Sequence, residues 1–300
     1  IIWGSIGSLT TDDFVYNILS DTAKHQIVIQ KYTGSANSVE IPSKITSNGI
    51  EYTVVGIGDG AFKNRSNLAS ITIPNTITQI GSGAFDGCDK LDYNIYDNGC
   101  YIGNDENPYL VLLMAKRQNI TECVINSNCK FIYDKAFNDC SSLSSIVIPA
   151  AVTSIGIYAF SGCTSLIKAE FTSIESLCNI NMDSDKNGYD FYGNKGNYSS
   201  NPLCNAHHLY IGGKEITDLV IPKSITNIGN GTFAGCNELK RVVFHESVSS
   251  ISESAFLGCS KLSSVTIPNS VESVGNYAFS MCEGLTTVII PKSVKTIGKD

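Results

Sequence analysis

Apolar residues recur along most of this chain with a period of 23 residues. In each period an isoleucine or valine is followed, four and five residues later, by a small residue and a phenylalanine. Seven copies of this motif occupy Ile57–Phe62, Ile80–Phe85, Ile132–Phe137, Ile155–Phe160, Ile228–Phe233, Ile251–Phe256 and Val274–Phe279. Such repetition is typical of a solenoid, in which each short unit buries its apolar face against the next.

One repeat shows the local structure that the pattern predicts. Apolar positions alternate with polar or small ones along Ser144–Ile148, which predicts a strand, and Pro149 ends it because proline cannot donate to a strand ladder. Gly156 is expected to permit a tight bend, and Phe160 to fill the core from a short helical turn. A repeat this short has no room for a full crossover helix. We therefore expect a parallel sheet on the concave side, with 3-10 turns and short strands on the convex side.

The equivalent strand positions should form one parallel ladder. Its members would be Ile73, Ile148, Ile221, Ile267 and Ile290. The spacing is broken twice: Phe85 and Phe137 are 52 residues apart, and Phe160 and Phe233 are 73 residues apart. Because these gaps exceed whole periods by only a few residues, we interpret them as divergent repeats with insertions, at about 93–118 and 176–212.

The first 55 residues lie outside the repeat. Residues 10–55 are predicted to form an N-terminal β cap, with a hairpin of Phe14–Ile18 and Gln26–Gln30 and a turn at Asn48-Gly49. Residues 1–9 are expected to be disordered or a remnant of processing or cloning. Residues 56–300 form the predicted solenoid. It stops in the middle of a repeat, so we expect the natural chain to continue.

Charge and composition exclude two classes of partner. Charged residues make up 16% of the chain, the formal net charge is −7, and no run of Lys or Arg occurs. Binding to a nucleic-acid backbone needs clustered positive charge, so nucleic acid is not an expected partner. No stretch approaches the ~20 apolar residues of a membrane span, so membrane insertion is not expected either. We expect a monomer.

The chain has 11 cysteines, and six of them occupy one position of the repeat. These six are Cys88, Cys140, Cys163, Cys236, Cys259 and Cys282. A cysteine locked to the repeat register is expected to be a small, buried, reduced side chain that stacks on its copies. Arg65 takes this position in the first repeat, where the charge is tolerable only beside solvent or the cap. Five cysteines are not assigned a role: Cys100, Cys123, Cys129, Cys178 and Cys204.

The repeated pattern I-P-x-x-V-x-x-I-G-x-x-A-F-x-x-C-x-x-L resembles the BspA-like (treponemal-type) leucine-rich-repeat family of surface proteins. The resemblance covers roughly Ile41–Ile297. It implies a right-handed solenoid, export to the cell surface, and adhesion or host-protein binding as a role. It implies no catalytic residues. The two insertions depart from the family pattern.

The concave face is one candidate binding surface. Its outward residues are predicted to be Ser70 and Thr72, Glu122 and Val124, Ser145 and Val147, Lys168 and Glu170, Asp218 and Val220, Arg241 and Val243, Ser264 and Thr266, and Thr287 and Ile289. These residues are mostly small and β-branched, which a sheet surface favours anyway. The face also lacks the aromatic anchors that dominate binding energies. A purely structural role is therefore the preferred interpretation.

The second insertion is the other candidate. Residues 182–200 place four aromatic residues among Gly, Asn and Ser: Tyr189, Phe191, Tyr192 and Tyr198. Rigid aromatic residues among small polar ones are typical of binding loops. We expect any ligand site to centre here, with Cys100–Pro108 as a second contact. The alternative is a glycine-rich surface loop whose tyrosines pack locally.

Two weak metal motifs lie in or beside this insertion. Asp183, Asp185 and Asn187 precede Gly188 and match the first half of a calcium loop, but Asn194 replaces the closing glutamate. Cys204, His207 and His208 offer too few ligands for a structural zinc site. No cofactor is expected, with calcium as the alternative.

The sequence therefore predicts a non-catalytic extracellular recognition or adhesion module that binds a host or matrix protein or glycan. The enzyme motifs that would suggest catalysis (a nucleophile elbow, a zinc-protease helix, a phosphate loop) do not occur. The alternative is a passive spacer that presents another domain at the cell surface. Fold alone does not separate these two functions.

Overall fold

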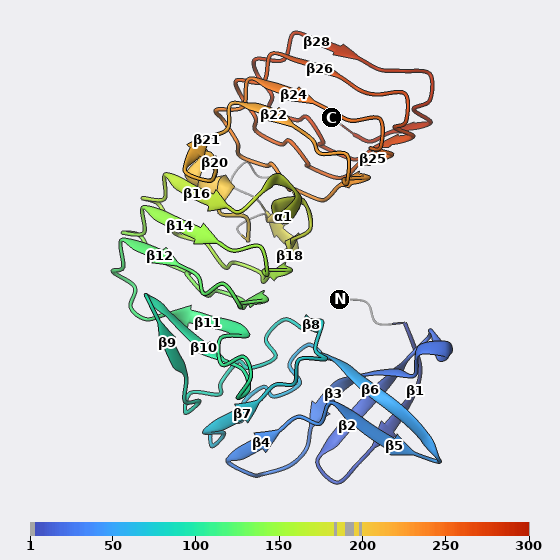
Figure 1. Cartoon of the computed structure of the whole chain (residues 1–300), viewed down its shortest axis with the longest axis vertical. Coiled ribbons are helices and arrows are strands. Elements are labelled where there is room, and N and C mark those ends of the chain that lie inside the picture. Colours follow the sequence, from blue (N-terminus) through green and yellow to red (C-terminus); the bar gives the residue numbers. More distant parts are fainter. Residues whose placement is uncertain (1–3, 183–184, 190–194, 198–199, 300) are drawn as a thin grey trace. The chain divides into compact units, whose positions relative to one another are not determined.

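The computed structural model describes residues 4–182, 185–189, 195–197 and 200–299. The fold is a mostly-β solenoid of about 11 turns with very little helix (Figure 1). Two compact units make up the chain: residues 1–96 with 100–113, and residues 97–99 with 114–300. Each unit is described by itself below.

The first unit begins with the predicted β cap. Its strands are β1 (Ser5–Thr10), β2 (Phe14–Leu19), β3 (Gln26–Tyr32), β5 (Lys44–Ser47) and β6 (Ile50–Ile57), with a 3-10 helix η1 (Thr22–Lys24). Strand β8 (Gln79–Ile80) of the repeats pairs parallel with β6. Strands β2 and β3 are antiparallel, as are β5 and β6, which turn at Asn48-Gly49. Both turn residues have a positive φ, as the predicted tight hairpin turn requires.

The N-terminal segment corrects one prediction. Residues 1–9 were expected to be disordered or a remnant, but Ser5–Thr10 forms β1, which pairs antiparallel with β2. Most of β1 is exposed, so its sequence carries no apolar alternation. The pairing therefore rests on backbone hydrogen bonds, which leave no signature in the side chains.

The cap supplies a substitute for the repeat that would precede the first one. Tyr32 stacks on Phe62 with ring centroids 5.3 Å apart, much as Phe62 stacks on Phe85 at 5.8 Å. Arg65 donates a hydrogen bond to the backbone carbonyl of Tyr32, and its guanidinium lies 5.4 Å from the centre of the Tyr32 ring. The charge at this cysteine position is therefore accommodated by the cap, as predicted.

The first unit also carries one side of the solenoid and the first insertion. Strands β4 (Ser38–Glu40) and β7 (Ser70–Thr72) are parallel, and Thr72 bridges to Gly103. The first insertion, at about residues 93–118, forms β9 (Asn94–Tyr96), β10 (Gly99–Ile102) and β11 (Val111–Ala115), which are neighbours in one sheet.

The second unit consists of stacked two-sided repeats. On the side that we call the strand face lie β12 (Glu122–Val124), β14 (Ser145–Ile148), β16 (Lys168–Phe171), β20 (Leu209–Ile211), β21 (Lys214–Glu215), β22 (Asp218–Val220), β24 (Arg241–Val243), β26 (Ser264–Thr266) and β28 (Thr287–Ile289). On the other side lie β13 (Phe131–Ile132), β15 (Ser154–Ile155), β17 (Asn181–Met182), β23 (Asn227–Ile228), β25 (Ser250–Ile251), β27 (Ser273–Val274) and β29 (Thr296–Ile297). Apart from the β20–β21 hairpin, neighbouring strands within each of these sheets are parallel. Most pairs join strands one repeat apart, as predicted, whereas β16 and β20 are separated by the second insertion.

The prediction of one unbroken ladder is wrong. The five equivalent isoleucines fall in or beside three separate sheets, β4-β7, β12-β14-β16-β20-β21 and β22-β24-β26-β28. Within the second unit the cause is visible: β21 folds back antiparallel on β20. It occupies the edge at which the next parallel strand would pair, so β22 starts a new sheet.

The core is a stack of phenylalanines capped by thiols. Phe137 and Phe160 stack at 5.2 Å, and Phe256 and Phe279 at 5.4 Å. Four register cysteines donate to the phenylalanine carbonyl 26 residues earlier: Cys88 to Phe62, Cys163 to Phe137, Cys259 to Phe233 and Cys282 to Phe256, at 3.1–3.3 Å. All 11 cysteines are free thiols, as expected for the six in register.

The register glycine has a different role from the predicted one. Gly156 does not have a positive φ, so it is not needed for a tight bend. A Cβ atom there would instead lie 2.6 Å from the backbone nitrogen of Asp134 in the preceding repeat. The same close approach recurs at Gly275, 2.5 Å from the nitrogen of Glu253. Glycine is required because neighbouring repeats touch here through their backbones.

Two short helices replace turns in the second insertion. Ser173 caps the N-terminus of helix α1 (Ile174–Cys178), because its side chain accepts a hydrogen bond from the backbone N–H of Ser176. Helix α2 (Leu203–Ala206) follows later in the chain. In the described part of the chain neither helix has the length or the apolar character needed to cross a bilayer. Elsewhere the phenylalanine turns are closed by hydrogen bonds between residues three apart.

Candidate functional site

The strand face of the second unit has the predicted arrangement of side chains. In most of its strands a buried residue lies between outward neighbours, as in β22, where Leu219 is buried between exposed Asp218 and Val220. In β28 all three residues are exposed. Strand pairing aligns these outward residues into two rows, with Asp218 beside Arg241 and Val220 beside Val243. The outward list predicted from the sequence is confirmed by this pattern of exposure.

One of these rows is mostly apolar, interrupted by Thr266, and is open to solvent. Val220, Val243 and Ile289 expose 62%, 37% and 57% of their surface. Between them, β24 and β26 form the floor of an open depression of about 340 Å³. Its lining includes Arg241, Val243, Phe244, Glu246, Thr266 and Pro268. The depression therefore combines a small apolar floor with one cationic and one anionic side chain.

A group of polar side chains lies where the first sheet of this face ends. Glu170 on β16 accepts hydrogen bonds from Lys168 at 2.7 Å and from the backbone N–H of Gly213 at 2.6 Å. The contact with Lys168 holds the pKa of Glu170 below its usual value. Because Gly213 lies in the turn between β20 and β21, this carboxylate fixes the hairpin against the sheet.

The hairpin adds an aromatic residue that the sequence analysis missed. Tyr210 on β20 lies beside Glu170 in the strand register, and the Lys168 ammonium is 5.2 Å from the centre of its ring. The second insertion hid the alignment of Leu209–Ile211 with the outward rows. The alternation of Leu209 and Ile211 around Tyr210 was the available signal. The statement that this face lacks aromatic residues is therefore wrong.

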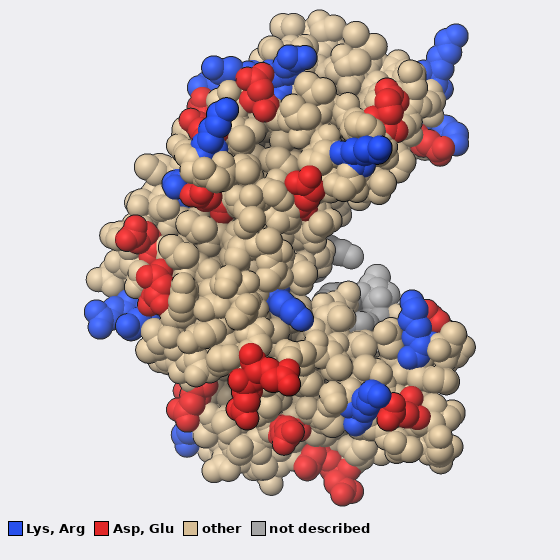
Figure 2. Space-filling model, in the orientation of Figure 1, with Lys and Arg blue, Asp and Glu red and all other residues tan. Residues whose placement is uncertain are grey.

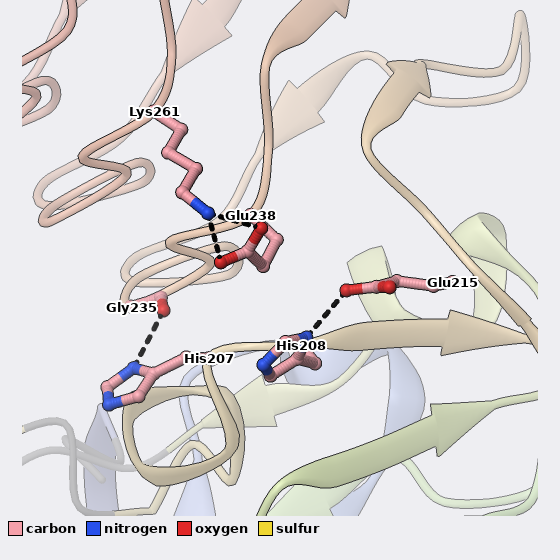
Figure 3. Close-up of polar contacts among 6 residues, drawn as sticks. All are labelled: His207, His208, Glu215, Gly235, Glu238 and Lys261. Carbon is pink, nitrogen blue, oxygen red and sulfur yellow. Dashed lines mark hydrogen bonds and ion pairs between the residues drawn. The ribbon is translucent and has the colours of Figure 1, made fainter.

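A histidine–glutamate contact and an ion pair border the hairpin on its other side (Figure 3). His208 Nδ1 lies 2.6 Å from Glu215 Oε1, and Lys261 Nζ lies 2.6 Å from Glu238 Oε1. The hydrogen bond from Lys261 holds the pKa of Glu238 below its usual value. These groups are partly exposed, and such pairs contribute little to stability. They form a charged border to the strand face and present no nucleophile held against a base.

The side chains of Cys204, His207 and His208 contact separate partners. His207 Nδ1 lies 3.1 Å from the Gly235 carbonyl, whereas His208 contacts Glu215 (Figure 3). The Cys204 thiol donates to the Ala234 carbonyl at 3.5 Å. Across the described residues, no three His, Cys, Asp or Glu side chains are grouped so that they could hold a metal ion.

The aromatic and calcium predictions fall largely outside the described residues. Phe191, Tyr192, Tyr198 and Asp183 lie outside them. Only the backbone is described for Asp185, Asn187 and Tyr189, which lie in β18 (Asp185–Tyr189), paired antiparallel with β19 (Lys195–Asn197). The described part of this segment therefore forms two paired strands. Its roles in ligand or calcium binding stay predictions.

The other proposed contact segment, Cys100–Pro108, is only partly at the surface. Cys100, Tyr101 and Ile102 are buried, at 2%, 0% and 3% exposure, so this part of the prediction is wrong. Exposed apolar residues lie instead on the preceding strand β9, at Ile95 and Tyr96. In the β9–β10 hairpin, β10 is buried and β9 is exposed to solvent.

Burial suppresses the reactivity of several cysteines. Burial raises the pKa of Cys140 to about 11 and that of Cys123, Cys163 and Cys178 to about 12. Because the thiolate is the reactive form, these thiols are inert at neutral pH. Cys282 differs from them, because its hydrogen bond with Cys259 lowers its pKa.

Several solved structures of leucine-rich repeat proteins are similar to this chain. A leucine-rich repeat protein from Bacteroides ovatus is 23% identical over 97% of this chain and 90% of its own, at a TM-score of 0.33. A leucine-rich cell surface protein from Faecalibacterium prausnitzii is 22% identical over 99% and 95%, at a TM-score of 0.34. The leucine-rich repeat protein of T. pallidum is 21% identical over 85% and 91%, also at 0.34. No curated protein sequence matches significantly.

The family assignment rests on the repeat itself. The model of the BspA-type leucine-rich-repeat region matches six copies, in residues 31–105, 114–184 and 208–300. The matched segments cover most of the chain, and they contain the seven phenylalanine motifs. The chain therefore belongs to the BspA-type leucine-rich-repeat family.

Proposed function

We propose that this chain is a non-catalytic recognition module that binds an extracellular protein or glycoprotein through the strand face of its second unit. Family membership favours a place at the cell surface. The acidic net charge of −7 disfavours nucleic acid as a partner. The tyrosine-rich residues 182–200 are a second proposed contact, since they belong to the same unit.

The observation that carries the proposal is the apolar row with its charged borders. Val220, Val243 and Ile289 are already partly covered by neighbouring strands, so full burial under a partner would contribute about 1 kcal/mol each. Arg241 lies in the neighbouring outward row beside Asp218, and the Lys168–Glu170 and Lys261–Glu238 ion pairs would supply further polar contacts. An apolar centre with a polar rim is the common anatomy of protein interfaces.

Tyr210 strengthens the same argument. It is a large, half-buried aromatic residue whose position is set by the β20–β21 hairpin and the Glu170–Gly213 hydrogen bond. Rigid aromatic residues lose little conformational entropy on binding, and they often dominate interface energies. The hairpin therefore supplies an anchor at the end of the first sheet, and the apolar row continues the surface over the next.

A binding panel tests the proposal. The chain is immobilised and exposed to extracellular-matrix and mucosal glycoproteins, with a heat-unfolded sample as the control. Saturable binding with a dissociation constant of about 1–10 μM or lower is expected, which corresponds to about 7–8 kcal/mol. Absence of saturable binding across the panel would favour the passive spacer.

A further inference from the structure

Strand β9 in the first unit is an unguarded sheet edge. It pairs with β10 on one side, and within the described residues no strand pairs with its other side. Tyr93, Ile95 and Tyr96 expose 48%, 50% and 39% of their surface. Exposed edges are usually protected by lysine, proline or a covering segment, because they pair readily with other chains. The sequence Tyr93-Asn-Ile-Tyr96 contains no such guard.

Contacts with Pro108 and Tyr109 hold strand β9 in place. Asn94 Nδ2 donates to the Pro108 carbonyl at 3.1 Å. The Tyr96 ring packs edge-on against Tyr109 at 5.7 Å, and Tyr109 packs against the fully buried Tyr101 at 5.6 Å. Strand β9 is therefore an ordered edge, so an added chain would meet a template that is already extended.

The surroundings of β9 are acidic. Asp92 directly precedes the exposed segment, and Asp105 and Glu106 lie in the loop that Asn94 joins through Pro108. All three carboxylates are exposed, and none forms an ion pair among the described residues. Between residues 66 and 113 the sequence has one cation, Lys90. Figure 2 shows Asp and Glu side chains gathered over the part of the first unit that contains β7, β9 and β10.

We propose that β9 accepts an extended, positively charged segment of a partner protein as an added β-strand. The backbone of the segment pairs with the free edge, its apolar side chains cover Tyr93 and Ile95, and its Lys or Arg side chains face Asp92, Asp105 and Glu106. This mode of recognition takes affinity from main-chain hydrogen bonds and specificity from alternate side chains. The surface is separate from the strand face of the second unit, so its test is independent of the function proposed above.

Charge selects this occupant over a second copy of the chain. Pairing β9 with β9 of another copy would bring two sets of Asp92, Asp105 and Glu106 together in a protein of net charge −7. Like charges held side by side oppose association. A cationic segment neutralises the same carboxylates, and its binding should weaken as salt is added.

Labelled peptides test the proposal on the full 300-residue chain. The probe is a fluorescein-labelled peptide of about ten residues that alternates Lys and Val, and binding is measured by fluorescence anisotropy. One control peptide has Glu in place of Lys. The other keeps every Lys but carries N-methyl groups on alternate residues, so it has the same charge and cannot pair as a strand. The Lys–Val peptide should bind saturably, and both controls at least ~10-fold more weakly.

Variants of the chain locate the binding. Tyr93→Ser/Ile95→Ser and Asp105→Asn/Glu106→Gln should each weaken the Lys–Val peptide by about 10-fold. Ile50→Ser, at a comparably exposed apolar residue of β6, should leave binding unchanged. Should a variant fold poorly, hydrogen exchange on the unmodified chain decides: the amides of residues 93–96 should exchange more slowly when the peptide is bound.

Four results would overturn the proposal. They are absence of Lys–Val peptide binding, equal binding of the N-methylated peptide, unchanged exchange at residues 93–96, and a dimer in sedimentation that Tyr93→Ser/Ile95→Ser dissociates. Equal binding of the N-methylated peptide would show that only charge attracts the probe. The dimer would show that a second copy occupies the edge.

Discussion

The thiol of Cys163 donates a 3.1 Å hydrogen bond to the backbone carbonyl of Phe137, 26 residues earlier in the chain. The same carbonyl also accepts from the backbone N–H of Cys140 at 3.1 Å. A carbonyl oxygen has two lone pairs, and the thiol occupies the second. The register cysteine therefore joins successive repeats by a directional contact in addition to its packing.

Replacing Cys163 distinguishes the donor role from packing alone. Cys163→Ala removes the thiol from a fully buried site and should lower the free energy of unfolding by about 2 kcal/mol, through a small cavity and a lost hydrogen bond. Cys163→Ser keeps a donor and should be less destabilising than Cys163→Ala in urea unfolding. If Cys163→Ser proves the worse of the two, the position would be a simple apolar site. Ser145→Ala, on the strand face, is the control and should have little effect.

The buried thiols should make the protein less stable at alkaline pH. Burial raises the pKa of Cys123 and Cys163 to about 12, whereas an unfolded thiol titrates near ~8.5. The folded state therefore keeps the protons that the unfolded state loses. The stabilisation is complete below ~8.5 and declines as the pH rises toward 12. Urea midpoints should fall between pH 7.5 and pH 10.5.

The decrease in the free energy of unfolding at high pH should depend on individual cysteines. Cys123→Ala removes one thiol whose ionisation penalises the folded state. This variant should be less stable than the unmodified chain at pH 7.5, yet it should lose about 3 kcal/mol less between pH 7.5 and pH 10.5. Parallel pH profiles for the variant and the unmodified chain would show that ionisation of Cys123 does not contribute.

In the first repeat, Arg65 should have the hydrogen-bonding role that the register cysteine has in the later repeats. It donates to the Tyr32 carbonyl as Cys88 donates to the Phe62 carbonyl, and it also covers the Tyr32 ring. Arg65→Ala should cost about 1–2 kcal/mol in the first unit. Arg65→Cys should recover part of this loss, because a thiol can reach the same carbonyl. Equal stability of the Ala and Cys variants, measured by hydrogen exchange in β3, would contradict the equivalence.

Much of the repeat could be predicted because its cause is periodic. Alternation placed Leu219 inside and Val220 outside, and the fixed spacing of Phe137 and Phe160 identified the stacked core. Each of these positions is determined by one requirement, which is burial against the neighbouring repeat. The two outward rows of the strand face follow directly from that rule.

The remaining features depend on contacts that periodicity does not encode. The sheet ends at β20 because Lys214 and Glu215 turn back on it, and that turn lies inside an insertion without repeat spacing. The displaced register also concealed Tyr210. Gly156 is required by the backbone of Asp134 in the preceding repeat, and only the assembled stack reveals that contact.

Two variants that each insert positive charge test most directly whether the strand face of the second unit binds the partner. Val220→Lys/Val243→Lys places two cations on the apolar row of the strand face, and Met281→Lys places one at an exposed apolar residue in a turn away from the strands. Both are compared with the unmodified chain, using the glycoprotein that binds best in the panel. The account predicts that the double variant loses at least ~10-fold in affinity while Met281→Lys binds normally. Unchanged affinity of the double variant, with loss in Tyr189→Ala/Tyr192→Ala, would contradict the account and place recognition in the second insertion.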